Sequence, residues 1–290
     1  MHFTKMQGLG NDYVYVDCFQ ERLAGVDLAD LARRVSDRRF GVGSDGLILI
    51  MPGEGGADFR MRVFNADGSE GDMCGNGMRC LARYVYEHGY TRKRRFSVLT
   101  RAGIIEPAII VDDAGRVTGV RVNMGRPGLT RGEVPMAGEP CQSARDVALR
   151  AGDREFVGTG VNMGNPHFVI AVDDAASFPV ATYGPLLERH EAFPRRANIE
   201  FVTPVARDRI IMRVWERGSG ITWACGTGAS AALVALAAAG RVDRSATVSL
   251  LGGDLRIEWA GDGNVYMTGP AEEVFTGEYP VTEVRTSEDC

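Results

Sequence analysis

Two cysteines occur in the same short motif, 151 residues apart: Cys74 opens "CGNG" and Cys225 opens "CGTG". A run without proline follows each motif, "MRCLARYVYEHG" at 78–89 and "ASAALVALAAAG" at 229–240. Each run predicts a helix that ends at a glycine. We therefore expect each thiol at a helix N-terminus, where free N–H groups and the helix dipole favour the thiolate and lower its pKa.

Two thiols in equivalent settings suit reversible inversion at a carbon acid. If the motifs face one cleft, one thiolate can remove a proton from Cα while the opposing thiol delivers a proton to the other face. The glycines lack a Cβ and let a carboxylate approach the backbone N–H groups closely. The same N–H groups would stabilise the enediolate-like charge that develops. The pattern thus predicts Cys74 and Cys225 as a catalytic acid and base.

The motifs belong to an internal repeat. "MRVFN" at 61–65 matches "MRVWE" at 212–216 with the same offset of 151, and "GNDYVYV" at 10–16 matches "GNPHFVI" at 164–170 with a small indel. Three matches in the same order are unlike chance. The repeat predicts two homologous halves, which we place at 1–124 with the first cysteine and 125–274 with the second.

Each half shows the same sequence of elements. "FRMRVFN" at 59–65 and "RIIMRVWE" at 209–216 alternate apolar and polar residues, as strands do. The run at 229–240 is apolar nearly all round, which predicts a fully buried helix. The predicted fold class is therefore mixed α/β (α+β), with two pseudo-symmetric domains, each a mixed or antiparallel sheet wrapped around a central helix. Further strands are expected at 13–17, 46–51, 96–100, 104–111, 116–124, 167–172, 246–252 and 255–261.

Other roles for the cysteines are less consistent with the pattern. A single buried cysteine is usually structural, but the repeat favours a shared role. The spacing from Cys74 to Cys80 is not that of a zinc knuckle, and the chain has four histidines. Residues six apart point to different sides of a helix, so we expect Cys80 in the core. No motif surrounds Cys18, Cys141 or Cys290, and we assign them no role.

Polar residues also occupy equivalent places in the repeat. Asn65 and Glu216 each precede their cysteine by nine residues, and Tyr13 and His167 each follow an asparagine by two. For Glu216 and His167, a surface glutamate and a core histidine bonded to the backbone explain the sequence as well as a role at a site does. The repeat favours a site role, as pKa modulators or as ligands of a substrate amine. Arg217 suits a second carboxylate, although a solvated arginine is commoner.

Composition is typical of a soluble globular protein, with 44% hydrophobic and 24% charged residues. A net charge of -5 and a pI near 5.5 argue against general affinity for nucleic acid or anionic membrane. The N-terminus "MHFTKMQGLGNDYVYVD" lacks the apolar region of a signal peptide. Six scattered cysteines do not form a disulfide framework. We expect a cytoplasmic protein with reduced thiols.

Five stretches together resemble the diaminopimelate epimerase family: "KMQGLGNDYV", "FNADGSEGDMCGNGMRC", "NMGNPHFV", "ANIEFV" and "VWERGSGITWACGTGASAA". The resemblance covers nearly the whole chain. It implies interconversion of LL- and meso-2,6-diaminopimelate without PLP or metal, on the route to lysine and peptidoglycan. It also implies a pseudo-twofold pair of α/β domains, with the tail 275–290 returning to the first. The partners expected are the small-molecule substrate and, in a homodimer, a second copy of the chain.

By resemblance, Cys74 and Cys225 are the catalytic acid/base residues, and His167 and Glu216 modulate their pKa values. The substrate-binding residues that carry over are Asn11, Asn65, Gly75, Asn76, Asn165, Asn198, Glu216, Arg217, Gly226 and Thr227. Two positions depart from the family pattern. Some members have a substrate-contacting glutamine at the place of Gly46, and many have a glutamate at the place of Ile221.

Three alternatives stay open at this point. A cofactor-independent racemase or isomerase of the same superfamily, such as a proline racemase-like enzyme, is the nearest. The asparagine set with Arg217 argues against it, because a second amino acid head group needs polar contacts far from the inverted carbon. A thiol redox protein that uses Cys74 and Cys225 as a reversible disulfide would need neither the asparagines nor Arg217. A protein that only binds a small anion is the least specific reading.

Overall fold

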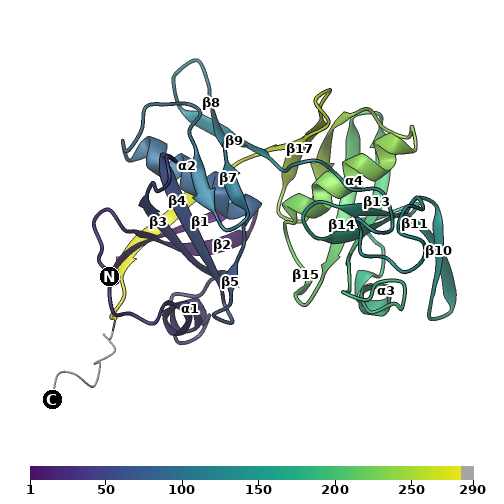
Figure 1. Cartoon of the computed structure of the whole chain (residues 1–290), viewed down its shortest axis with the longest axis horizontal. Helices are drawn as coiled ribbons and strands as arrows, with labels where there is room; N and C mark the ends of the chain where they lie inside the picture. Colours follow the sequence, from purple (N-terminus) through teal and green to yellow (C-terminus); the bar gives the residue numbers. More distant parts are fainter. Residues whose placement is uncertain (282–290) are drawn as a thin grey trace. The chain divides into compact units, whose positions relative to one another are not determined.

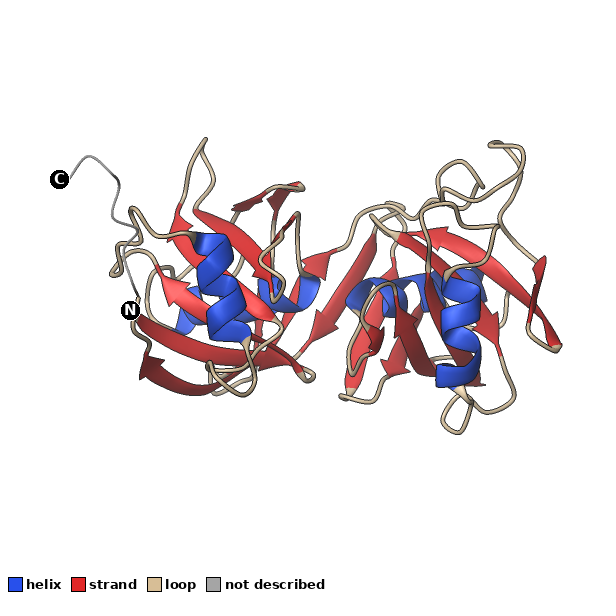
Figure 2. Cartoon of the chain, turned by 90° about the horizontal axis from the view of Figure 1, so that it is seen from below, coloured by secondary structure: helices blue, strands red, loops and turns tan. Residues whose placement is uncertain are grey.

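The computed structural model describes residues 1–281 and divides into two compact units. One unit comprises Met1–Val122 together with the described residues from Pro270 onward, and the other is Asn123–Gly269. Helices pack against strands in both units (Figures 1 and 2). Among the described residues, no helix is long and apolar enough to cross a membrane.

The sheet of the first unit has the strand order β19-β1-β2-β3-β4-β6-β7, with β5 beside β4. Strands β2 and β3 are parallel, whereas β1 pairs antiparallel with both β2 and β19. The elements are β1 (His2–Gly8), β2 (Asn11–Asp17), α1 (Leu28–Ser36), β3 (Gly46–Pro52), β4 (Phe59–Asn65), β5 (Glu70–Gly71), α2 (Gly75–Glu87), β6 (Val98–Thr100), β7 (Gly103–Ile105) and β19 (Glu272–Glu278). After β7 the chain forms the hairpin of β8 (Ala108–Val111) and β9 (Val117–Asn123).

The central strands of this sheet are covered on both faces. Val14 and Val16 pack in the cluster that contains Leu31 of α1. The alternate residue Tyr15 points the other way and donates a hydrogen bond from its hydroxyl to the carbonyl of Gly77 in α2, at 3.3 Å. Because the central strands are covered on both faces, the neighbouring strand β3 is an almost continuous apolar run.

In the second unit, the strands follow the order β10-β11-β12-β13-β14-β16-β17-β18, with β15 beside β14. Helix α4 contacts strands on both sides of this order, from β11 to β18, so the sheet wraps around the helix. The elements are β10 (Val147–Ala151), β11 (Arg154–Asn162), β12 (Pro166–Ala171), α3 (Val180–Glu188), β13 (Asn198–Ala206), β14 (Arg209–Glu216), β15 (Gly220–Ile221), α4 (Gly226–Ala238), β16 (Ser245–Ser249), β17 (Asp254–Trp259) and β18 (Val265–Gly269).

The predicted central helices are confirmed. Helix α4 is buried along nearly its whole length, because its alanines let the strands approach from every side. Gly89 and Gly240, which follow α2 and α4, have φ values of 78° and 69°, in the left-handed region that a glycine cap adopts at low cost. The mixed α/β fold class is confirmed with them.

The two units repeat the same register around a parallel strand pair. In the first, Tyr13 of β2 lies opposite Gly46 of β3. In the second, His167 of β12 lies opposite Asn198 of β13. Two residues further along, Ile48 and Glu200 therefore occupy equivalent places on β3 and β13.

The structure corrects one predicted strand and adds several elements. Residues 104–111 form two strands, β7 and β8, separated at Glu106 and Pro107, because proline has no N–H to donate to a ladder. Helices α1 and α3 and strands β1, β5, β10, β11, β15, β18 and β19 were not predicted from local pattern. In the tail, β19 pairs with β1, and the rest of the predicted tail, 282–290 with Cys290, lies outside the described residues.

Candidate active site

Each repeated cysteine is the N-cap of its helix. Cys74 has φ −130° and ψ 114°, and its sulfur accepts a hydrogen bond from Gly77 N at 3.3 Å. Cys225 has φ −129° and ψ 103°, and its sulfur accepts from Gly228 N at 3.3 Å. The sulfur takes the place of the side-chain oxygen that usually caps a helix. The predicted placement of both thiols at helix N-termini is confirmed.

The second glycine of each CGxG motif is required by close packing. A Cβ on Gly77 would lie 2.5 Å from Ile48 Cδ1 and 3.3 Å from Cys74 Cβ. A Cβ on Gly228 would lie 2.8 Å from Glu200 Oε1 and 3.1 Å from Cys225 Sγ. The motif therefore brings the start of each helix against its sheet, directly beside the thiol.

The expected direction of the thiol pKa shift is wrong for both cysteines. Burial raises the pKa of Cys74, although the Gly77 N–H, the Tyr13 hydroxyl and the charge of Arg79 all act to lower it. Desolvation of a thiolate outweighs the stabilisation that the helix N-terminus supplies. The helix end is present as predicted, but the burial that accompanies it was not part of the sequence argument.

Cys225 has a more acidic environment. Burial again comes first and raises the pKa of its thiol well above the ordinary value, and the charges of Glu216 and Glu200 raise it further. Thr227, whose hydroxyl oxygen lies 3.6 Å from the sulfur, acts in the opposite direction. The second thiol is thus held more firmly in its protonated form.

In the first unit, Asn11 links the thiol to the strand ends. Its Oδ1 accepts from Cys74 Sγ at 3.7 Å and from Asn76 Nδ2 at 3.1 Å. Its own amide nitrogen donates to Asp45 Oδ2 at 2.7 Å, and Arg38 Nη2 donates to the other oxygen of that carboxylate at 2.9 Å. Asp45 therefore fixes the amide of Asn11 with its oxygen toward the sulfur.

Two further predicted residues of this unit lie near the same turn. Gly75 and Asn76 form the first turn of α2. Asn65, the last residue of β4, is exposed and donates from Nδ2 to Ser69 Oγ at 3.0 Å. Its hydrogen bond is to its own turn, not to the residues around Cys74.

In the second unit, His167 is completely buried between two oxygen partners. Its Nδ1 lies 2.7 Å from Glu200 Oε1, and its Nε2 lies 2.8 Å from Asn165 Oδ1. His167 and Glu200 both have no exposed side-chain surface. The structure therefore brings together two of the predicted residues, His167 and Asn165, and places beside His167 an acid, Glu200, that the sequence argument did not single out.

The remaining predicted residues of this unit gather at the end of β14. Buried Asn198 donates to Pro166 O at 3.0 Å and accepts from Arg217 N at 2.9 Å. The guanidinium of Arg217 donates to a backbone carbonyl, that of Arg195. Glu216 accepts from the Thr222 hydroxyl.

Burial is the main reason that the pKa of Glu216 is raised. The Thr222 hydroxyl, the charge of His167 and a hydrogen bond from Cys225 all lower it, and the charge of Glu200 raises it. Gly226 and Thr227 form the first turn of α4. The repeat thus places an acid, a thiol and a helix N-terminus together in the second unit.

The family model described as diaminopimelate epimerase matches residues 3–130 and 159–274. The chain is 54% identical over 282 residues to the diaminopimelate epimerase of Moorella thermoacetica, covering 97% of this chain and 100% of that protein. It is 52% identical over 280 residues to the diaminopimelate epimerase of Pelotomaculum thermopropionicum, covering 97% and 99%. The chain belongs to the diaminopimelate epimerase family.

Solved structures with low sequence identity share the fold of this diaminopimelate epimerase family member. A probable proline racemase from Agrobacterium radiobacter matches with a TM-score of 0.68 at 16% identity, over 96% of this chain and 92% of that one. A hydroxyproline epimerase from Agrobacterium vitis matches with a TM-score of 0.66 at 15% identity, over 96% and 91%. At this identity, the likeness concerns the fold alone.

Sequence reasoning missed two acids that contact candidate residues of this family member, Asp45 beside Asn11 and Glu200 beside His167. Glu200 had a visible signal: it stands in "ANIEFV", a charged residue inside an apolar strand, where an unpaired charge is costly. Asp45 stands in "GVGSDG" at 41–46, directly before Gly46, where no local pattern marks it. Cys80 is buried in α2, as predicted for a core residue.

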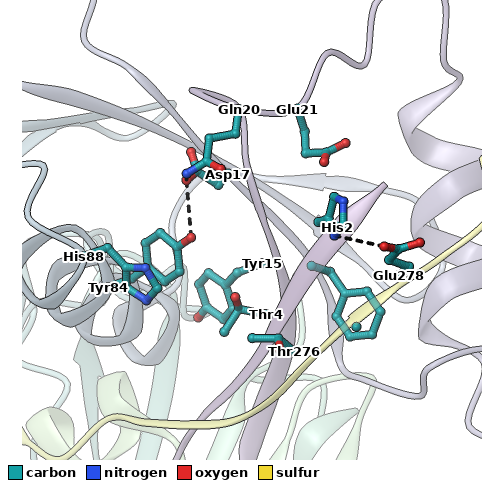
Figure 3. A pocket seen from close by; sticks show the side chains of 12 residues that line it. His2, Thr4, Tyr15, Asp17, Gln20, Glu21, Tyr84, His88, Thr276 and Glu278 are labelled. Atoms are coloured by element: carbon teal, nitrogen blue, oxygen red, sulfur yellow. Dashed lines mark hydrogen bonds and ion pairs between the residues drawn. The ribbon is translucent and has the colours of Figure 1, made fainter.

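A cavity of about 480 Å³ lies in the first unit, away from the motifs of the family (Figure 3). It is lined by the start of β1, the end of β2, the last turn of α2 and β19. Tyr84 points toward Asp17 and donates to its Oδ2 at 3.3 Å. None of the predicted site residues lines this cavity, and we assign it no catalytic role.

Proposed function

We propose that this protein is an isomerase that interconverts LL-2,6-diaminopimelate and meso-2,6-diaminopimelate, with Cys74 and Cys225 as its two acid/base residues. One observation carries the proposal: the same thiol caps the same buried helix in both copies of a duplicated fold. Both sulfurs accept a hydrogen bond from the N–H three residues along, so the two thiols keep the same setting in both copies. Inversion at Cα by two bases uses one such group on each face of the carbon.

The proposed reaction moves one proton off a carbon and another onto it. The thiolate of one cysteine takes the proton from Cα, and its sulfur becomes a thiol. The thiol of the other cysteine gives its proton to the opposite face of the same carbon and becomes the thiolate. The N–H groups at the starts of α2 and α4 bind the substrate carboxylate and stabilise the enediolate-like charge between the two steps.

The two predicted halves, 1–124 and 125–274, each supply one thiol and part of the substrate contacts in this proposal. Asparagines suit the amine and carboxylate groups of an amino acid because their amides both donate and accept. Arg217 is assigned to the second carboxylate of the substrate. The substrate-binding residues proposed are Asn11, Asn65, Gly75, Asn76, Asn165, Asn198, Glu216, Arg217, Gly226 and Thr227.

His167 and Glu216 are proposed as the residues that tune Cys225. Their charges are opposite, and both act inside a buried environment where charge effects are strong. Glu216 raises the pKa of the Cys225 thiol, and His167 lowers that of Glu216. The balance between them sets how readily Cys225 gives up its proton.

We further propose that the protein acts in the cytoplasm on a small-molecule substrate and forms a homodimer. Neither nucleic acid nor membrane is a proposed partner. The net charge of -5 supports the absence of these two partners.

For the dimer, β19 is an edge strand of its sheet, and Val274 and Phe275 on it are 57% and 48% exposed. Edge strands that expose apolar side chains favour pairing. Light scattering on Phe275→Lys should show a smaller mass than for the original chain.

The direct test is product analysis. Reduced protein incubated with LL-2,6-diaminopimelate should form the meso isomer until the two reach equilibrium, as followed by chiral chromatography. A proline racemase-like activity would instead invert L-proline. If folded, reduced protein leaves LL-2,6-diaminopimelate unchanged, the proposed function is wrong.

A further inference from the structure

Glu188 is the last residue of helix α3, and its side chain is buried. Its Oε2 accepts a hydrogen bond from Trp215 Nε1 at 2.8 Å, and its Oε1 accepts from Gly218 N at 3.2 Å. These two donors lie on either side of Glu216 and Arg217 in the chain. An acid from another element therefore holds both flanks of a segment that carries two predicted site residues.

The chemistry of the donors fixes the direction of both hydrogen bonds. An indole N–H and a backbone N–H can only donate, and they contact different oxygens of the same carboxyl group. Neither contact depends on a tautomer or on the orientation of an amide. The side chain of Glu188 is thus held with one oxygen toward Trp215 and the other toward Gly218.

Glu188 is also connected to the loop that contacts the Arg217 side chain. Arg196 Nη1 lies 3.6 Å from Glu188 Oε1, and the carbonyl of the preceding residue, Arg195, accepts from Arg217 Nη1 at 3.1 Å. Arg196 has φ 58°, a left-handed conformation that non-glycine residues seldom adopt. Such a conformation persists where its surroundings hold it, and Glu188 supplies one of the contacts that do.

Helix α3 packs directly against the Trp215 ring. A Cβ on Gly184, one helical turn before Glu188, would lie 2.6 Å from both Cβ and Cγ of Trp215. Residues four apart share one face of a helix. This face of α3 therefore combines a glycine that admits the indole with an acid that accepts its N–H.

The turn after β14 needs support of this kind. Arg217 and Gly218 are exposed, and Gly218 has φ 81°. A glycine in an exposed turn lets the backbone adopt several conformations. Asn198 accepts from the N–H of Arg217, and Glu188 accepts from groups on either side of that position.

The first copy of the fold closes the equivalent turn with a side chain of its own. Ser69 donates to Asp67 Oδ1 from its N at 2.8 Å and from its Oγ at 2.5 Å. Gly218 occupies the place of Asp67 in the repeat and has no side chain that could cap its turn. In the second copy, the acid comes from α3 instead.

We propose that Glu188 is a positioning residue that holds Arg217 in place for the second carboxylate of the substrate, and so supports selection of a dicarboxylic amino acid. The role of Arg217 rests on the proposed function. A guanidinium binds a carboxylate best when its direction is already fixed, because ordering a long side chain during binding costs affinity. Loss of Glu188 therefore weakens substrate binding and leaves both thiols in place.

Hydrogen exchange followed by NMR tests the contacts and needs no substrate. Glu188→Met keeps a side chain of similar length and removes both strong acceptors. The Trp215 indole N–H and the Gly218 amide should then exchange about tenfold faster or more. The indole of Trp259, which donates to Gly263 O at 3.3 Å, should be unchanged and shows that the fold is intact. Unchanged rates at Trp215 and Gly218 would overturn the proposal.

A double-mutant cycle with Arg217 tests the positioning. Glu188→Met should lower kcat/KM for LL-2,6-diaminopimelate about fivefold to tenfold, mainly through a higher KM. In an Arg217→Gln background, the same change should lower kcat/KM less than about twofold, because the side chain that Glu188 positions is already gone. No loss in the original chain, or an equal loss in both backgrounds, would overturn the positioning role.

Tyr183→Phe is the matched control on the same helix. It removes the hydrogen bond of the Tyr183 hydroxyl to Asp153 Oδ1 at 3.2 Å, and KM should stay as in the original chain. A rise in KM equal to that of Glu188→Met would mean that any change in α3 has this effect, and would overturn the proposal. If the original chain fails to epimerise diaminopimelate, the proposed function is wrong, and hydrogen exchange still decides whether Glu188 holds the turn.

Discussion

The two thiols cap equivalent helices, and the strand positions beside them differ in three side chains. Around Cys74, the equivalent positions on β2, β3 and β4 hold Tyr13, Ile48 and Asn65. Around Cys225, the same positions on β12, β13 and β14 hold His167, Glu200 and Glu216. At these three positions, one copy therefore has neutral side chains, and the other has a histidine and two acids.

The difference teaches that the duplicated scaffold fixes where the thiols are, while a few strand positions set how acidic each one is. Burial raises the pKa of both thiols, but only Cys225 has carboxylates that raise it further. Arg79 and Tyr13 act in the opposite direction on Cys74. We therefore expect Cys74 to be the first of the two to lose its proton in the free protein.

The largest expected effect comes from removing either thiol. Cys74→Ala and Cys225→Ala should each lower the rate of epimerisation by about a thousandfold or more, because neither thiol can replace the other on its face of the carbon. Cys141→Ala is the control, since Cys141 is exposed and belongs to no motif. Retention of more than a small fraction of activity in either variant would contradict the paired roles.

Alkylation should distinguish the two copies. At neutral pH, iodoacetamide should modify Cys74 roughly tenfold faster than Cys225, because only thiolates react and the higher pKa of Cys225 leaves less thiolate. Peptide mass spectrometry measures both rates in one sample. Glu216→Asn, which makes the second copy resemble the first, should speed modification of Cys225 and leave Cys74 unchanged. Equal rates in the original chain would remove the proposed asymmetry.

A medium effect is expected from the acid that orients Asn11. Asp45→Asn removes the charged acceptor and frees the Asn11 amide to turn its nitrogen toward Cys74. We expect kcat/KM to fall about fivefold to tenfold. Asp67→Asn is the control, because Asp67 is an exposed acid that caps its own turn. If the two variants behave alike, Asp45 does not position Asn11.

The smallest effect concerns the hydroxyl that supports Glu216. Thr222 lowers the pKa of Glu216 against the stronger effect of burial. Thr222→Val should therefore raise the pKa of Glu216 further, and the acidic limb of the activity profile should move to higher pH, with about a twofold loss at neutral pH. Thr118→Val, at an exposed site, is the control. An acidic limb that stays in place would separate Glu216 from the titration.

The fold class and the two helix-capping cysteines could be predicted because each copy of the repeat is a short stretch of local sequence. Paired motifs with one offset identified both helices, and alternating residues identified β4 and β14. Elements such as β1 and β19 carry no clear local pattern, and their pairing joins residues near opposite ends of the chain. Contacts of that kind follow from tertiary packing, which a window of sequence does not contain.

The sequence singled out only part of the polar network that the structure shows. Cysteines, His167 and Glu216 stood at repeat positions, but Glu200 and Asp45 contact partners 33 and 34 residues away in the chain. The direction of the thiol pKa shift was wrong because the sequence showed the helix end and not the burial. Desolvation depends on atoms from several strands, none of which lies in the motif.

Isotope transfer from solvent tests the two-thiol mechanism most directly. Reduced protein is incubated with LL-2,6-diaminopimelate in D2O, and both isomers are analysed by mass spectrometry at low conversion. If one thiol takes the proton and the other supplies a deuteron, the meso product carries one deuterium while the remaining substrate carries almost none. Equal deuterium in product and remaining substrate would mean that a single base serves both faces, and would contradict the paired roles of Cys74 and Cys225.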